Sequence, residues 1–137
     1  VMEHLTNPFL VTKMFASKLR KGGQFLFSTI SIGSPDFRLF GEYWYALDLP
    51  RHKVFFRKKD IEKMLNEQFR IRGMYYHAAP RDFIGSARYR TKSRSGFPTR
   101  FVDSLLLALG EKNAWYLTFA LAMMHKTTRI SFHAVRK

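Results

Sequence analysis

Apolar and polar residues alternate along this chain in patterns that predict helices and strands. Asn7 and Pro8 suit the N-cap and first position of a helix, and apolar residues then recur at helical spacing. Such spacing places these residues on one face of the helix, which is predicted to pack on the core. The predicted core stripe consists of Val11, Met14, Phe15 and Leu19.

A glycine pair follows this helix and separates it from the next element. Arg20 and Lys21 are predicted to lie in its last turn, where cations are favourable, and Gly22 and Gly23 are predicted to end it. Residues 24–32 come next and are largely apolar. A run of this kind is typical of a strand that is covered on both faces.

The remaining pattern adds one amphipathic helix and two strands. Residues 58–68 form the helix, with Ile61, Met64 and Leu65 facing inward. The strands are expected near residues 69–77 and 128–136, which together with 24–32 gives three. In the second strand, alternation places Phe69, Ile71, Gly73 and Tyr75 on one face. Helices that alternate with strands indicate an α/β fold, with chemistry at the carboxyl ends of its parallel strands.

Two longer connections carry distinctive compositions. Residues 37–56 form an aromatic-rich connection, predicted to be a functional loop or a loop pinned to the core. Residues 78–127 are interpreted as a basic loop and a helical insertion. The loop, residues 78–100, contains the single acid Asp82, the interleaved aromatic residues Tyr89 and Phe97, and the cations Arg81, Arg88, Arg90, Lys92, Arg94 and Arg100.

Residues 101–109 and 114–124 are two apolar helical stretches. Gly110 begins the short segment that divides them. Neither stretch reaches the roughly 20 apolar residues that span a bilayer. We therefore expect a helical hairpin that packs over the sheet, covers a substrate pocket or forms a dimer contact.

Composition limits the classes of protein and partner. The 137 residues fit one domain or part of one, and a hydrophobic content of 46% suffices for a core. The chain has no cysteine, which excludes disulfides and is compatible with the cytoplasm. The formal net charge of +14 suggests an anionic partner such as nucleic acid, acidic lipid or a phosphorylated substrate. Alternatively, acidic sequence outside this chain offsets that charge.

An ordered set of short matches resembles the class I S-adenosylmethionine-dependent methyltransferases, of the small-molecule type with a Glu-His pair after the fourth strand. The pair is Glu3 and His4, and other matches include Trp44 and His52. The matching segments are residues 1–5, 7–8, 19–23, 44, 50–52, 55–56, 60–65, 69 and 134–137. The resemblance covers the first half of the chain and its last residues, and it implies a last strand antiparallel to its neighbours.

The resemblance also has implications for the cofactor and the extent of the domain. The family holds S-adenosylmethionine with a glycine-rich loop after the first strand, and no G-x-G-x-x-G occurs in this chain. Residues 1–137 are therefore expected to be the C-terminal portion of a Rossmann-like methyltransferase domain, inactive alone. A complete small α/β domain is the alternative.

Five residues are candidates for the site. By the resemblance, His4 is the candidate general base beside Glu3, since histidine exchanges protons near neutral pH. Trp44 and Tyr45 are candidate walls of an aromatic or lipid-like substrate pocket, and His52 either orients the substrate or bonds the loop backbone. Some relatives bind a divalent cation through Glu-x-x-Glu-His. The first glutamate of that motif would precede this chain, and no metal site is predicted.

Non-enzymatic roles remain as alternatives. The basic loop with Tyr89 and Phe97 suits single-stranded nucleic acid, and the apolar hairpin with its basic flank suits an anionic membrane surface. The strand at residues 24–32 is expected to lie at a sheet edge, which favours self-association. The expected location is the cytoplasm, and peripheral attachment to a membrane is the alternative.

Overall fold

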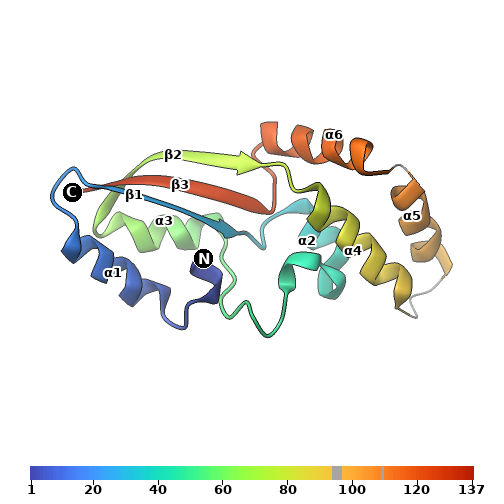
Figure 1. Cartoon of the computed structure of the whole chain (residues 1–137), viewed down its shortest axis with the longest axis horizontal. Coiled ribbons are helices and arrows are strands. Elements are labelled where there is room, and N and C mark those ends of the chain that lie inside the picture. Colours follow the sequence, from blue (N-terminus) through green and yellow to red (C-terminus); the bar gives the residue numbers. More distant parts are fainter. Residues whose placement is uncertain (94–96, 109) are drawn as a thin grey trace.

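The computed structural model describes residues 1–93, 97–108 and 110–137, apart from the side chains of residues 97–100, 102 and 106. These residues form an α/β structure with one sheet (Figure 1). The strands are β1 (Gln24–Ile30), β2 (Phe69–His77) and β3 (Arg129–Arg136). The helices are α1 (Pro8–Lys18), α2 (Pro35–Phe40), α3 (Lys58–Asn66), α4 (Pro80–Lys92), α5 (Phe97–Ala108) and α6 (Gly110–Met123), with short 3-10 helices η1 (Met2–His4), η2 (Gly41–Tyr43) and η3 (Tyr45–Leu47).

The last strand lies in the middle of the sheet. The strand order is β1-β3-β2, and β3 runs antiparallel to both neighbours. β1 and β2 therefore run in the same direction without pairing, and their carboxyl ends lie at the same edge. Both ladders between the described strands are antiparallel, so the predicted parallel sheet is wrong for them. The three predicted strands and the antiparallel direction of the last one are confirmed.

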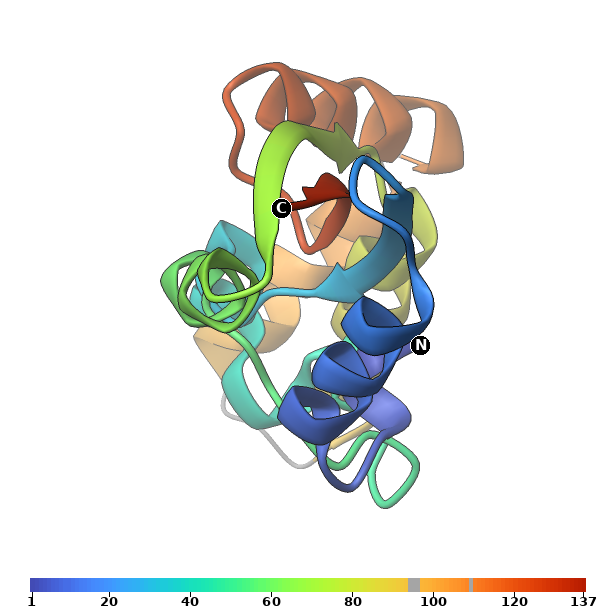
Figure 2. The same ribbon diagram turned by 90° about the vertical axis from the view of Figure 1, so that its left-hand side faces the viewer.

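Helices α1 and α3 lie on one side of the sheet, while α6 lies on the other side near the end of β2 (Figures 1 and 2). Phe25, Leu65 and Phe132 belong to the core between the sheet and the two helices. The opposite face of β1 is open, and Leu26 there is 65% exposed. The prediction that this strand is covered on both faces is wrong for the described residues, because burial alternates along it.

Helix α1 turns a different face to the core from the one predicted. It begins as expected, since the Asn7 side chain accepts a hydrogen bond of 3.0 Å from the Leu10 N–H. Its small residues Thr12 and Ala16 are buried, whereas Met14 is 51% exposed. The predicted stripe is therefore only partly right. Leu19 packs against the core and the Phe15 ring lies 5.3 Å from that of Phe25, but the smaller side chains make the closer approach.

The glycine turn between α1 and β1 is confirmed, although the helix ends earlier than predicted. α1 ends at Lys18, so Arg20 and Lys21 belong to the turn. Gly22 has a φ of 78°, which favours glycine. A Cβ atom on Gly23 would lie 2.8 Å from the Arg20 carbonyl oxygen, so both glycines are needed.

A β-bulge changes the faces of β2. The register against β3 shifts between Ile71 and Gly73. Phe69 and Ile71 contact the core as predicted, but beyond the bulge Met74 contacts it and Tyr75 is exposed. The prediction for the second half is wrong because one extra residue reverses the alternation.

Helix α3 buries Ile61, Met64 and Leu65, as predicted. The chain terminus completes the end of this helix. An Arg136 guanidinium nitrogen donates to the Gln68 carbonyl at 2.9 Å, and the Lys137 ammonium donates to the Asn66 carbonyl. These cations satisfy carbonyl groups that a helix end leaves unpaired.

The segment predicted to be a basic loop contains helix α4. Arg90 is buried in it and donates two hydrogen bonds, of 2.7 and 2.5 Å, to Asp103 of α5. The loop prediction is wrong because this segment has its own buried face. Arg81, Arg88 and Lys92 are exposed, the predicted cation Arg94 lies outside the described residues, and the Arg100 and Phe97 side chains are also outside them.

Helices α5 and α6 follow one another but do not cover the sheet as a hairpin. Gly110, with a φ of 73°, is the first residue of α6. α4 packs against both helices, and His125 after α6 stacks on Tyr76 of β2 with ring centroids 4.7 Å apart. Among the described helices, none is long and apolar enough to cross a membrane.

Replacing Arg90 with methionine is expected to lower the free energy of unfolding by about 3–5 kcal/mol, because Asp103 would remain buried without its counter-charge. Urea unfolding measures this loss. Arg88→Met is the control on the exposed side of α4, with an expected change within about 0.5 kcal/mol. The double variant Arg90→Met with Asp103→Leu should recover most of the loss. Equal losses in Arg90→Met and Arg88→Met would contradict the role of the ion pair.

The free edge of β1 is expected to promote self-association, since β1 pairs only with β3 among the described strands. Sedimentation velocity over a range of concentrations tests this. Leu26→Lys adds a charge on the edge strand and should shift the chain toward monomer. Leu39→Lys, at an exposed position on α2, should leave the association unchanged. A parent chain that stays monomeric at high concentration would contradict the prediction.

Candidate functional site

The five residues predicted for the site line one pocket. Glu3, His4, Trp44, Tyr45 and His52 all border a cavity of about 520 Å³. The cavity also includes Arg129, which pairs in the sheet with Ile30 at the end of β1 and with His77 at the end of β2. The pocket therefore lies beside the carboxyl ends of both parallel strands.

The η1 segment holds Glu3 and His4 against the sheet. Met2 is buried in the core beside them. The Glu3 carbonyl accepts hydrogen bonds from the N–H groups of Lys53 and Val54, at 2.7 and 3.1 Å. These backbone bonds join the start of the chain to the segment that carries His52, so residues 48 positions apart share one site.

Glu3 is a buried and hydrogen-bonded carboxylate. Its Oε2 accepts from the Thr29 hydroxyl at 3.0 Å and from the Val1 ammonium group at 2.8 Å. Burial alone would raise the pKa of Glu3, but hydrogen bonds from the Val1 ammonium group, the backbone and Thr29 outweigh burial, so the pKa lies below its usual value. Glu3 is therefore ionised at neutral pH.

Backbone carbonyl groups orient both histidines in the same way. His4 Nδ1 lies 3.1 Å from the Arg51 carbonyl oxygen, and His52 Nδ1 lies 2.7 Å from the Ala46 carbonyl oxygen. A carbonyl oxygen only accepts, so each Nδ1 carries the hydrogen and each neutral ring keeps its lone pair on Nε2. The ring centroids are 4.6 Å apart, and His4 Nε2 lies 3.8 Å from Glu3 Oε1.

Glu3, His4 and His52 also carry possible metal ligands. Among the described residues, they form a group whose ligand atoms lie nearly close enough for one metal ion. One ligand atom from each residue lies within 4.8 Å of the others. Two ligands of one zinc ion are at most about 4 Å apart, so the widest separation would have to shorten on binding. Sequence reasoning missed this group because His52 lies in a separate segment, and the prediction of no metal site remains untested.

Trp44 and Tyr45 play different parts in the wall of the pocket. Trp44 is fully buried, and its indole N–H donates to Asp36 Oδ2 at 3.0 Å, so it supports the wall. Tyr45 is partly exposed, and its ring centroid lies 5.4 Å from that of Tyr89. Its backbone N–H donates to Ser86 of α4 at 2.8 Å. Tyr45 and Tyr89 are the aromatic rings available to a ligand.

Arg129 is a residue of the pocket that sequence reasoning missed. Its guanidinium group donates to the Asp82 carboxylate at 2.8 and 3.1 Å. Hydrogen bonding to Asp82 raises the pKa of Arg129, although burial opposes this, so the cation is permanent. The available signal was Asp82 itself, since a single acid within a basic segment indicates a structural ion pair.

Replacing Thr29 with valine should raise the pKa of Glu3, because it removes a donor to the ionised carboxylate. Because the pKa of Glu3 is lower in the folded state than in the unfolded state, ionised Glu3 stabilises the fold when the pH is above the unfolded-state pKa. This stabilisation is lost as the pH falls through the folded-state pKa. The variant should therefore lose about 1.5–3 kcal/mol of unfolding free energy at neutral pH. At acid pH, with Glu3 protonated, the loss should largely disappear.

Carbon-detected NMR titration of the Glu3 carboxyl and urea unfolding at the two pH values measure both effects. Thr29→Ser keeps the hydroxyl and serves as the matched control. An unchanged titration of Glu3 in Thr29→Val would contradict this account of its electrostatics.

The chain was compared with protein-family profiles, with curated proteins and with solved structures. None of these three comparisons gave a match. The assignment of the pocket therefore depends on its own geometry: an ionised glutamate, two oriented histidines, an aromatic pair and a fixed arginine cation at the carboxyl ends of β1 and β2.

Proposed function

We propose that this chain carries the acceptor side of an S-adenosylmethionine-dependent methyltransferase that acts on a small or lipid-like molecule. The observation that carries the proposal is the convergence of Glu3, His4 and His52 with two aromatic residues around one pocket. The resemblance implies the roles of Glu3 and His4, and the sequence suggested the other site residues from two separate segments. The carboxyl ends of parallel strands are also where α/β folds bind their ligands.

The residues of this chain fit the acceptor better than the cofactor. The sequence has no glycine-rich fingerprint, and the described residues around the pocket supply no such loop after a strand. S-adenosylmethionine, when bound, would supply an electrophilic methyl group. We assign none of its contacts to this chain and expect its cradle in another segment of the protein.

His4 is the residue placed to accept a proton from the acceptor. Its Nε2 lone pair is free of the backbone, because Nδ1 bonds the Arg51 carbonyl. As His4 takes the proton, the nearby Glu3 carboxylate stabilises the imidazolium cation. The Thr29 hydroxyl donates a hydrogen bond of 3.0 Å to Glu3 Oε2, and this bond favours the ionised form of Glu3.

The other pocket residues indicate the kind of acceptor. Tyr45 and Tyr89 offer aromatic faces, and Arg129 offers a cation whose charge is partly neutralised by Asp82. An acceptor with an ionisable hydroxyl and an apolar or aromatic body suits this combination. Trp44 cannot donate to the acceptor because Asp36 already accepts from its indole N–H.

Calorimetry tests the division between acceptor and cofactor. This chain alone should show no saturable binding of S-adenosylmethionine, even at a millimolar ligand concentration. A protein in which a glycine-rich cofactor-binding segment is joined to this chain should bind the cofactor. There, His4→Ala should lower kcat by about 100-fold or more with little effect on cofactor Kd, since a base acts in the transition state.

His125→Ala, at an exposed position after α6, is the matched control and should leave kcat unchanged. No cofactor binding by the longer protein would remove the methyltransferase proposal. Tight binding by this chain alone would show that its place in the domain has been misassigned. If His4→Ala retained full turnover, the general base would be another residue.

A further inference from the structure

Helix α6 buries its small residues and exposes its large apolar residues, which is the reverse of the usual pattern on a surface helix. Its buried residues are Ala114, Thr118 and Ala122, which recur every four positions and therefore share one face. The large apolar residues point elsewhere and are exposed. They are Trp115, Tyr116, Leu117, Phe119 and Met123.

This exposed apolar face is large for a helix in contact with water. Tyr116 is 65% exposed and Met123 is 70% exposed. The rings of Trp115 and Phe119 stack on one another with centroids 5.0 Å apart, so they form one continuous surface. Contiguous apolar patches of this kind mark surfaces that are covered by a partner or a membrane.

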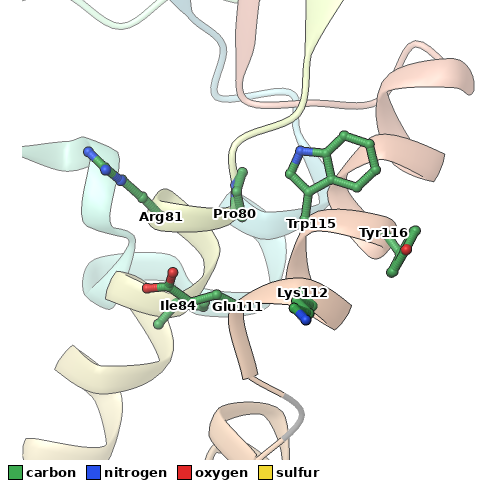
Figure 3. Close-up of a pocket in the computed structure, with 7 residues that line it drawn as sticks. All are labelled: Pro80, Arg81, Ile84, Glu111, Lys112, Trp115 and Tyr116. Atoms are coloured by element: carbon green, nitrogen blue, oxygen red, sulfur yellow. The ribbon is translucent and has the colours of Figure 1, made fainter.

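A pocket at the start of α6 extends this surface toward α4 (Figure 3). It has a volume of about 480 Å³, and its walls are mostly apolar. Pro80 and Ile84 of α4 and Trp115 of α6 line it. The charged lining residues are the cations Arg81 and Lys112 and the acid Glu111. The same place therefore offers apolar contact area and positive charge.

The charges around α6 are predominantly positive. Residues 78–127 contain eight lysine and arginine residues and three acids. Two of those acids, Asp82 and Asp103, are buried and paired with arginines, which leaves Glu111 as the exposed acid. The exposed cations of the described residues in this region are Arg81, Arg88, Lys92, Lys112 and Lys126. Lys112 and Lys126 lie near opposite ends of α6.

We propose that the exposed face of α6, with these cations, docks onto an anionic lipid bilayer. The helix would lie in the interface, since its 14 residues extend about 21 Å and do not span a bilayer. Tryptophan, tyrosine and basic residues are the side chains that favour the headgroup region. This inference is independent of the methyltransferase proposal.

Other occupants fit the surface less well. Nucleic acid would satisfy the cations but would leave Phe119 and Met123 in water. A second copy that docked through α6 would bring the exposed cations Lys112 and Lys126 of both copies close together, and these cations would repel one another. Helix α1 lies on the opposite side of the sheet from α6 (Figures 1 and 2), so a neighbour that covered α1 would leave α6 exposed.

Vesicle flotation and tryptophan fluorescence test the proposal with the whole chain. The chain has two tryptophans, and Trp44 is buried, so a change on adding vesicles reports on Trp115. Phosphatidylglycerol-containing vesicles should float the chain at low salt and shift its emission to shorter wavelength, whereas phosphatidylcholine vesicles should do neither. Lys112→Glu should weaken binding at least about fivefold.

Paired variants test whether vesicle binding depends on α6 or on any exposed apolar or basic side chain. Trp115→Ser together with Phe119→Ser should abolish flotation, whereas Leu26→Ser removes an exposed apolar side chain from β1 and should not. Lys18→Glu, on α1, is the control for charge and should bind nearly as well as the parent chain. Circular dichroism verifies that each variant keeps its fold.

Three outcomes would overturn the proposal. One is the absence of flotation and of a spectral shift with anionic vesicles at low salt. Another is equal loss of binding in the α6 variants and their β1 and α1 controls. The third is a spectral shift that depends on chain concentration without vesicles, which would identify a second copy as the occupant.

Discussion

The pairing of β3 between β1 and β2 is the constraint on which the rest of the structure depends. Residues 129–136 come last in the sequence but occupy the centre of the sheet. Arg129, the first residue of β3, brings the carboxyl ends of β1 and β2 together, and the pocket forms there. At the other end of β3, Arg136 bonds Gly22 and Gln68, which fixes the turn before β1 and the end of α3.

Two ion pairs with buried carboxylates hold the helical region together and attach it to the sheet. Asp82 of α4 accepts from Arg129 of β3, so one carboxylate both positions α4 and neutralises a cation at the pocket. Asp103 of α5 accepts from Arg90 of α4, which joins those two helices. The Arg90–Asp103 pair is buried on both sides, so removing one partner leaves an uncompensated charge and destabilises the fold more than the intact pair stabilises it.

Local patterns predicted the elements, and tertiary contacts decided their faces. The three strands and the inward residues of α3 follow from periodicity alone. The bulge in β2 depends on its register with β3, which a single segment does not encode. The sequence predicts a loop where α4 forms, because the many cations there obscure the helical spacing of Phe83, Ala87 and Arg90. All three residues are buried. Likewise, the sequence suggested the pair Glu3 and His4 and, in a separate segment, His52. Only the fold shows that His52 lies beside the pair.

The exposed apolar faces of α1 and α6 have different physical characters, and this supports assigning them different occupants. Helix α1 packs beside the start of β1, where the ring centroids of Phe15 and Phe25 are 5.3 Å apart. The free edge of β1 carries backbone groups that are unpaired among the described strands. An edge strand requires another strand or chain, because lipid offers it no hydrogen bonds. Helix α6 has its backbone groups satisfied within the helix, so apolar contact is all that its exposed face lacks. A lipid interface provides that contact together with the negative charge that Lys112 and Lys126 favour.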